Sequence, residues 1–223
     1  MISKILRKVY QMEHRKVDRF YQTEFRTSEN EPGVIEGRPI VFESRTDIGG
    51  MFSETIEKGA LDGTNLKDVL FFVNHDTNKI PLARSRNNNE NSTLQLMVDE
   101  HGLRFKTKLD IEHNPEAAAL YSAIQRRDIT GMSFGFRVAE DKWENIESEY
   151  PSRSIKKIEM VQEISACSFP AYEATSIYTR SLDSDRTMLD SVRGELVDTK
   201  AKMDAIEKMR LRNQLLSKLG GLN

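Results

Sequence analysis

The chain has 223 residues, 30% of them charged, and a formal net charge of -2 at pH 7. This near balance argues against a general nucleic-acid binder, and no apolar run reaches the roughly 20 residues that a bilayer span needs. The single cysteine, Cys167, excludes an internal disulfide and is typical of a reducing compartment. The four histidines are scattered, and we find neither a zinc-type cluster nor a glycine-rich phosphate loop. We therefore expect no metal and no cofactor.

Three zones differ in pattern along the chain. Residues 1–31 are polar and charged, and we interpret them as an N-terminal helical arm because four apolar residues recur there at helical spacing: Ile2, Ile5, Leu6 and Val9. Residues 32–180 have mainly strand patterns and are expected to form the main domain. Residues 181–223 are strongly charged, with leucines and other apolar residues at three- and four-residue steps. This last pattern predicts a charged C-terminal helix or coiled-coil tail.

Within the main domain the clearest element is a hairpin. Alternating apolar residues in 94–98 and 103–109 flank the turn Asp99-Glu100-His101-Gly102, a typical hairpin pattern. Earlier, the residues from Val34 to Glu43 predict one interrupted strand. Later, Asn114-Pro115 predicts the start of a helix that ends near Arg127, with asparagine as the cap and proline in the first turn.

Two further strands follow the predicted helix. In the first, Met132, Phe134, Phe136 and Val138 point to one face, while Ser133, Gly135 and Arg137 point to the other. The second runs roughly from Ile155 to Ser165. There the alternation predicts Ile158 and Ile164 on one face, and Val161 and Glu163 on the opposite face.

Ser133 and His75 have local contexts that indicate chemistry. Ser133 lies between small residues in Gly131-Met132-Ser133-Phe134-Gly135, and His75 ends an apolar run from Val69. Serine is a poor nucleophile until a base takes its proton, and the unperturbed pKa of histidine suits that task near neutrality. Separate elements can bring such a pair together.

Each of these residues also has a structural interpretation. His75 can cap a sheet, and Ser133 can be small because a neighbouring element packs closely. Glu163 can form an ion pair with a nearby basic residue, and Asp76 can belong to a turn. Cys167 is most simply a buried small hydrophobe. On spacing alone, a serine hydrolase is one hypothesis among these alternatives.

Five segments in order resemble the prohead proteases of tailed bacteriophages, the capsid maturation proteases related in fold to herpesvirus assemblins. The segments are a glycine-alanine element, an asparagine-histidine-aspartate motif, a glycine-leucine hairpin, a serine motif and a closing strand with proline-alanine. They correspond to Phe52–Leu61, Phe72–Asp76, His101–Phe105, Arg127–Phe136 and Glu163–Ala171. The resemblance covers roughly Val34 to Tyr178.

The resemblance implies an α+β, mainly β fold: a single barrel-like, assemblin-like domain with a few helices and helical extensions at both termini. It also implies a serine endopeptidase with Ser133 as nucleophile and His75 as general base. Assemblins use a second histidine as third member, but no histidine follows Ser133 here. We expect Glu163 in that role rather than Asp76, because a strand neighbour of His75 normally points away from it. For the oxyanion, backbone N–H groups or the nearby basic residues Arg153, Lys156 and Lys157 are candidates.

The same resemblance implies the biological setting. The enzyme is expected in the host cytoplasm, inside the assembling, portal-containing prohead, where it self-associates and cleaves the scaffolding segment of the major capsid protein and then itself. We expect it to be absent from the mature virion and to have no nucleic-acid or membrane partner. Two alternatives stay open: an inactive assembly factor of the same fold, and a cysteine hydrolase that uses Cys167.

Overall fold

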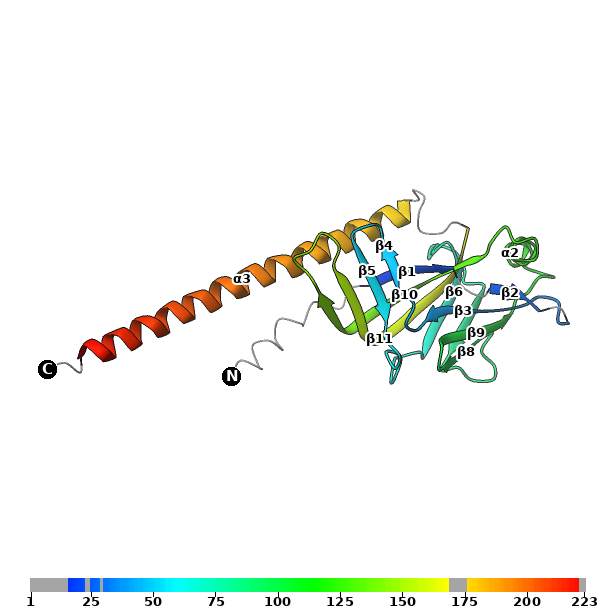
Figure 1. The fold of residues 1–223 in the computed structure, drawn as a ribbon. Helices are drawn as coiled ribbons and strands as arrows, with labels where there is room; N and C mark the ends of the chain where they lie inside the picture. Colours follow the sequence, from blue (N-terminus) through cyan, green and yellow to red (C-terminus); the bar gives the residue numbers. More distant parts are fainter. Residues whose placement is uncertain (1–15, 23–24, 29, 169–175, 221–223) are drawn as a thin grey trace. The chain divides into compact units, whose positions relative to one another are not determined.

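The computed structural model describes residues 16–22, 25–28, 30–168 and 176–220. The chain divides into two compact units, Met1–Leu182 and Asp183–Asn223. Strands dominate the first unit, as Figure 1 shows, and the described residues contain two helices, α2 (Pro115–Gln125) and α3 (Ser176–Gly220). The α+β, mainly β class is therefore confirmed. The strands form two sheets rather than one closed sheet, so the assemblin-like barrel stays a prediction.

The larger sheet has seven strands in the described residues. Its main path runs β1-β10-β11-β5-β4, while β6 pairs with β11 and β7 pairs with β6. The strands are β1 (Lys16–Gln22), β4 (Thr46–Ile48), β5 (Phe52–Ile56), β6 (Asp68–Val73), β7 (Ala83–Arg86), β10 (Gly131–Glu144) and β11 (Ser152–Cys167). Both β5 and β6 lie parallel to the long strand β11, at different points along it. Strand β11 therefore joins distant segments of the chain.

The smaller sheet contains the predicted hairpin. Its order is β2-β3-β9-β8, with β2 (Phe25–Thr27), β3 (Val34–Val41), β8 (Leu94–Asp99) and β9 (Gly102–Lys108). Strands β8 and β9 pair antiparallel from Leu94↔Thr107 to Asp99↔Gly102, so the hairpin prediction is confirmed. The interrupted strand is also confirmed, because the register of β3 against β9 shifts between Gly37 and Ile40.

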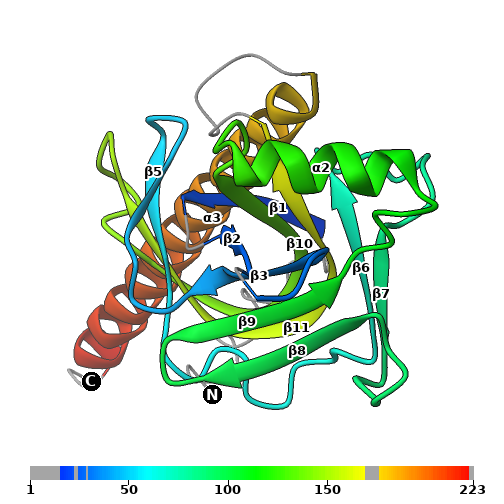
Figure 2. The same ribbon diagram turned by 90° about the vertical axis from the view of Figure 1, so that its right-hand side faces the viewer.

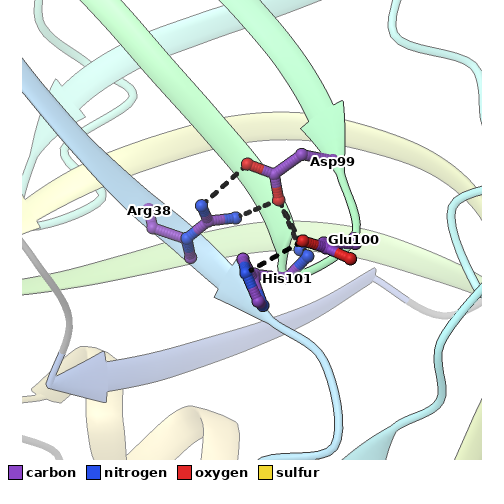
Figure 3. A network of polar contacts seen from close by, with 5 residues as sticks. Arg38, Asp99, Glu100 and His101 are labelled. Carbon is purple, nitrogen blue, oxygen red and sulfur yellow. Dashed lines mark hydrogen bonds and ion pairs between the residues drawn. The ribbon is translucent and has the colours of Figure 1, made fainter.

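An ion pair ties the hairpin turn to β3 (Figure 3). The Arg38 guanidinium donates to both carboxylate oxygens of Asp99, at 2.5 and 2.8 Å. Asp99 Oδ1 also accepts from the backbone N–H groups of His101 and Gly102. The Arg38 hydrogen bond is the largest cause that holds the pKa of the Asp99 carboxyl well below its usual range. The turn is thus bound to the neighbouring strand where β3 changes register.

Helix α2 follows the predicted capping pattern. Asn114 is its N-cap, and its side chain accepts from the N–H groups of Glu116 and Ala117. Pro115 occupies the first turn, where its missing N–H costs no hydrogen bond. The helix ends at Gln125, slightly before the predicted end. Its buried residues, Ala117, Leu120 and Ile124, join a core that both sheets share, and Figure 2 shows the helix lying across one end of the strands.

The N-terminal arm differs from its prediction. Residues 16–22 and 25–27 are strands, in which β1 pairs with β10 and β2 pairs with β3. The helical arm predicted for residues 1–31 is therefore wrong for these residues, because pairing with an available strand overrides local composition. The apolar residues Ile2, Ile5, Leu6 and Val9 lie outside the described residues.

Bulges between β10 and β11 place Val161 on a different face of the sheet from the one predicted. Gly135 pairs with Glu163, but the next residue, Phe136, pairs with Val161, so Gln162 is an extra residue on β11. A one-residue slip turns the following side chains to the other face. Val161 therefore lies in the core with Phe136, and not on the face of Glu163 as simple alternation predicted.

Beyond residue 182, helix α3 continues through the second unit. Several of its large apolar side chains are more than half exposed: Val197, Met203, Ile206, Met209, Leu211 and Leu215. Charged residues separate them, and no helix in the described ranges has the length and apolarity needed to cross a membrane.

Candidate active site

The pairing of β10 with β11 brings Ser133 and Glu163 to one face of the sheet. Ser133 pairs with Ser165, and Gly135 pairs with Glu163. Directly paired residues of antiparallel strands share a face, so these four residues project together. Their neighbours Met132 and Phe134 turn the other way into the core, as predicted, and both are fully buried. Gly135 has no side chain, which leaves room beside Glu163.

The turn after β6 brings His75 to the same face. Strand β6 pairs parallel with β11 as far as Val73↔Ala166. Asn74 and His75 then adopt positive φ angles of 51° and 57°. The Asn74 side chain bonds twice to Ser168, donating to its Oγ at 3.2 Å and accepting from its N–H at 3.0 Å. His75 thus leaves the strand in a left-handed turn whose preceding residue is bound to the end of β11.

Ser133, His75 and Glu163 form one hydrogen-bonded chain. His75 Nε2 lies 2.6 Å from Ser133 Oγ, and His75 Nδ1 lies 2.7 Å from Glu163 Oε1. Because an ionised carboxylate only accepts hydrogen bonds, Nδ1 carries the proton in the neutral imidazole and Nε2 is free to accept from the serine hydroxyl. The structure therefore brings together all three residues that the sequence singled out.

The site is secluded from water. Ser133 and Glu163 are each 2% exposed, and the His75 side chain is 10% exposed. Burial alone would lower the pKa of His75, but the adjacent Cys167 sulfur and Glu163 carboxylate raise the pKa, and the net shift is upward from 6.5. We attribute the upward direction to Glu163, because its carboxylate is hydrogen-bonded to the imidazole at 2.7 Å. The carboxylate thus stabilises the imidazolium that forms when His75 takes a proton.

Asp76 and Cys167 occupy other positions. The Asp76 carboxylate accepts from the Asn78 N–H at 3.2 Å, so Asp76 belongs to the turn. Cys167 is buried, as expected for a small hydrophobe. No histidine is near it in sequence, but the fold places it beside His75. Its sulfur lies 3.8 Å from the Ser165 carbonyl oxygen. Among the described residues, the hydroxyl of Ser133 is the nucleophilic group bonded to His75 Nε2.

The basic residues suggested for the oxyanion lie elsewhere. Arg153 pairs with Trp143 at the far end of β10, where its guanidinium bonds to Glu54 and Asp141. At about 3.3 Å per residue, the stretch of β10 from Ser133 to Trp143 is roughly 30 Å long. Lys156 and Lys157 are exposed on the same distant part of β11. The suggestion is therefore wrong for all three residues.

Sequence reasoning missed one residue of the site. Ser165 Oγ donates to Glu163 Oε2 at 2.6 Å and accepts from the His75 N–H at 3.3 Å. Its position two residues after Glu163 predicted the correct face. A hydroxyl on that face gave no indication of its partners, which depend on the turn at His75. No group of three histidine, cysteine, aspartate or glutamate side chains in the described ranges can hold a metal ion.

Comparisons with known proteins identify the family of the chain. A model of the caudovirus prohead serine protease family matches residues 21–190. The prohead protease of Enterobacteria phage HK97 is 33% identical over 173 residues, which cover 77% of this chain and 71% of that protein. No solved structure matches the chain. Since the family model spans most of the chain, including the segments that carry Ser133, His75 and Glu163, the chain belongs to the caudovirus prohead serine proteases.

Proposed function

We propose that Ser133, His75 and Glu163 are the catalytic triad of this capsid maturation protease. The observation that carries the proposal is the continuous chain of short hydrogen bonds from Ser133 Oγ through the imidazole to Glu163. His75 Nε2 accepts the Ser133 proton as Oγ attacks the scissile carbonyl, and a tetrahedral intermediate bound to Oγ forms. The imidazolium then protonates the leaving amine as the C–N bond breaks, which leaves an acyl-enzyme that water hydrolyses by the reverse route.

Glu163 has a supporting part in this mechanism. By accepting from Nδ1–H it holds the tautomer and the orientation of the ring, and its charge stabilises the imidazolium. Both effects are stronger in a buried site, where water screens charges poorly.

The substrate that we propose is the scaffolding segment of the major capsid protein inside the assembling prohead, followed by the protease itself. Membership of the prohead protease family supports action within the prohead and contact with capsid proteins. We further propose that the enzyme self-associates in the portal-containing prohead in the host cytoplasm and is lost before the virion matures.

Co-expression of the protease with the major capsid protein of its own phage tests the triad, with capsid mass as the measurement. Ser133→Ala should lower processing by at least about 10³-fold, because only binding and oxyanion contributions remain. The variant should unfold at the same denaturant concentration as the parent. Undiminished processing would reject the assignment and favour an inactive assembly factor.

Cys167→Ala is the informative companion variant. It removes the only thiol of the chain and leaves the hydrogen bond between Ser133 and His75 in place, so processing should continue. Loss of processing in Cys167→Ala, together with normal processing in Ser133→Ala, would instead favour the cysteine hydrolase.

A further inference from the structure

A buried hydroxyl lies behind the imidazole and the carboxylate of the proposed triad. Ser165 is on β11, directly paired with Ser133 on β10 and with Phe72 on β6. Ser165 is 0% exposed. A buried hydroxyl normally needs hydrogen-bond partners to offset its desolvation, and the partners of Ser165 both belong to the site.

The two hydrogen bonds of Ser165 have unambiguous directions. Glu163 Oε2 can only accept when ionised, so the Ser165 O–H donates to it over 2.6 Å. The His75 backbone N–H can only donate, so Ser165 Oγ accepts from it over 3.3 Å. One hydroxyl supplies one donor and two acceptor lone pairs, which makes both bonds possible at once.

We propose that Ser165 is a positioning residue that sets Glu163 and His75 relative to each other. Its bond to Oε2 leaves Oε1 directed at Nδ1, and its bond to the backbone of His75 supports a left-handed φ of 57° that few non-glycine residues adopt. The same atom thereby holds the carboxylate and the base of the triad. This inference rests on the proposed function, in which His75 activates Ser133.

Reaction of Ser133 with a fluorophosphonate probe gives a direct test, read as the rate of mass increase of the intact protein. In this reaction an Oγ–P bond forms, fluoride leaves, and the serine proton passes to His75. Ser165→Ala should slow labelling, and kcat for a peptide substrate, by about 10- to 100-fold, the loss expected for one hydrogen bond to a charged group. KM should change little, because the Ser165 hydroxyl bonds to Glu163 and to the backbone of His75.

Matched variants separate positioning from a structural effect. Ser85 is also 0% exposed, and no hydrogen-bond partner of its Oγ is found among the described residues. Ser85→Ala should therefore label at the parental rate. Ser165→Thr keeps the hydroxyl and should restore most of kcat. If Ser165→Ala does not fold, Ser165→Cys, which keeps the size and a weak donor, should still label more slowly than Ser85→Ala.

The outcomes distinguish the inference from the proposed function. Parental labelling rates in folded Ser165→Ala, or in Ser165→Cys where Ala fails to fold, would overturn the positioning role while leaving the triad intact. Failure of Ser165→Thr to exceed Ser165→Ala would overturn it as well. By contrast, absence of labelling at Ser133 in the parent, together with normal capsid processing by Ser133→Ala, would reject the triad itself.

Discussion

The hydrogen bonds of His75 decide the pH range in which the proposed site can work. A general base must be neutral before it can take the serine proton, and Glu163 holds the pKa of His75 above 6.5. The raised pKa means that the charged imidazole stabilises the fold. That stabilisation is complete below pH 6.5 and is lost as pH rises through the folded-state pKa. Activity should change in the opposite direction and rise with pH through the same pKa.

Glu163→Gln tests this coupling. Without the carboxylate, the acid limb of the kcat/KM profile should move to lower pH, and kcat should fall by about 10²- to 10⁴-fold because the tautomer is no longer held. The measurement is the pH dependence of peptide hydrolysis per folded molecule. Asp76→Asn is the matched control, since its carboxylate bonds to the turn at Asn78 and not to the imidazole. An unchanged acid limb in Glu163→Gln would show that another group sets the pKa of His75.

Among the secondary-structure elements, the β8–β9 turn depends on one glycine. Gly102 has a φ of 139°, and a Cβ there would overlap the Ile40 carbonyl of β3. Neither the turn nor β3 can shift easily, because Asp99 of the turn is bound to Arg38 of β3. The close approach of the two strands therefore requires the absence of a side chain.

Gly102→Ala should destabilise the protein by about 2–5 kcal/mol, through backbone strain and a clash with backbone atoms. Gly50→Ala is the control, because Gly50 also has a positive φ but its added Cβ would meet nothing within 4 Å. It should cost only about 1–2 kcal/mol. Urea unfolding in the Ser133→Ala background measures both. Equal losses of unfolding free energy in the two variants would mean that backbone strain alone, and not the close approach of β3, explains the need for glycine at position 102.

The elements differ in how well local sequence predicts them. The β8–β9 hairpin and helix α2 were predicted because alternation, a turn and the Asn114 cap lie within a few residues of one another. The strands in residues 16–27 were missed because their pairing partners are distant. The face predicted for Val161 was wrong because the bulge depends on the pairing register of β11 with β10. Likewise, Glu163 was identified by its place on the closing strand of the resembling family, whereas the role of Ser165 depends on the left-handed turn at His75.

At the scale of the whole molecule, the second unit raises the question of what covers its apolar residues. The exposed side chains of α3 beyond residue 190 need a partner surface to become buried. We predict that this partner is in the prohead, so that the tail recruits the enzyme to the shell. In an enclosed particle, even weak docking raises the local concentration of protease near its substrate.

A chain that ends at Asp190 keeps the residues matched by the family model and should remain folded and able to cleave peptides. It should nevertheless be depleted from proheads by about tenfold or more, if docking adds the usual avidity. The measurement is protease copy number per purified particle, with Ser133→Ala in every chain to prevent self-digestion.

Point variants of the full-length protein test the same surface. Met203→Lys combined with Ile206→Lys should deplete the protease from proheads to a similar extent. Asp204→Lys lies on the same turns but removes no apolar side chain, so it should be incorporated normally. Equal incorporation of full-length and shortened chains would show that α3 is not the packaging element and would assign that role to the N-terminal segment.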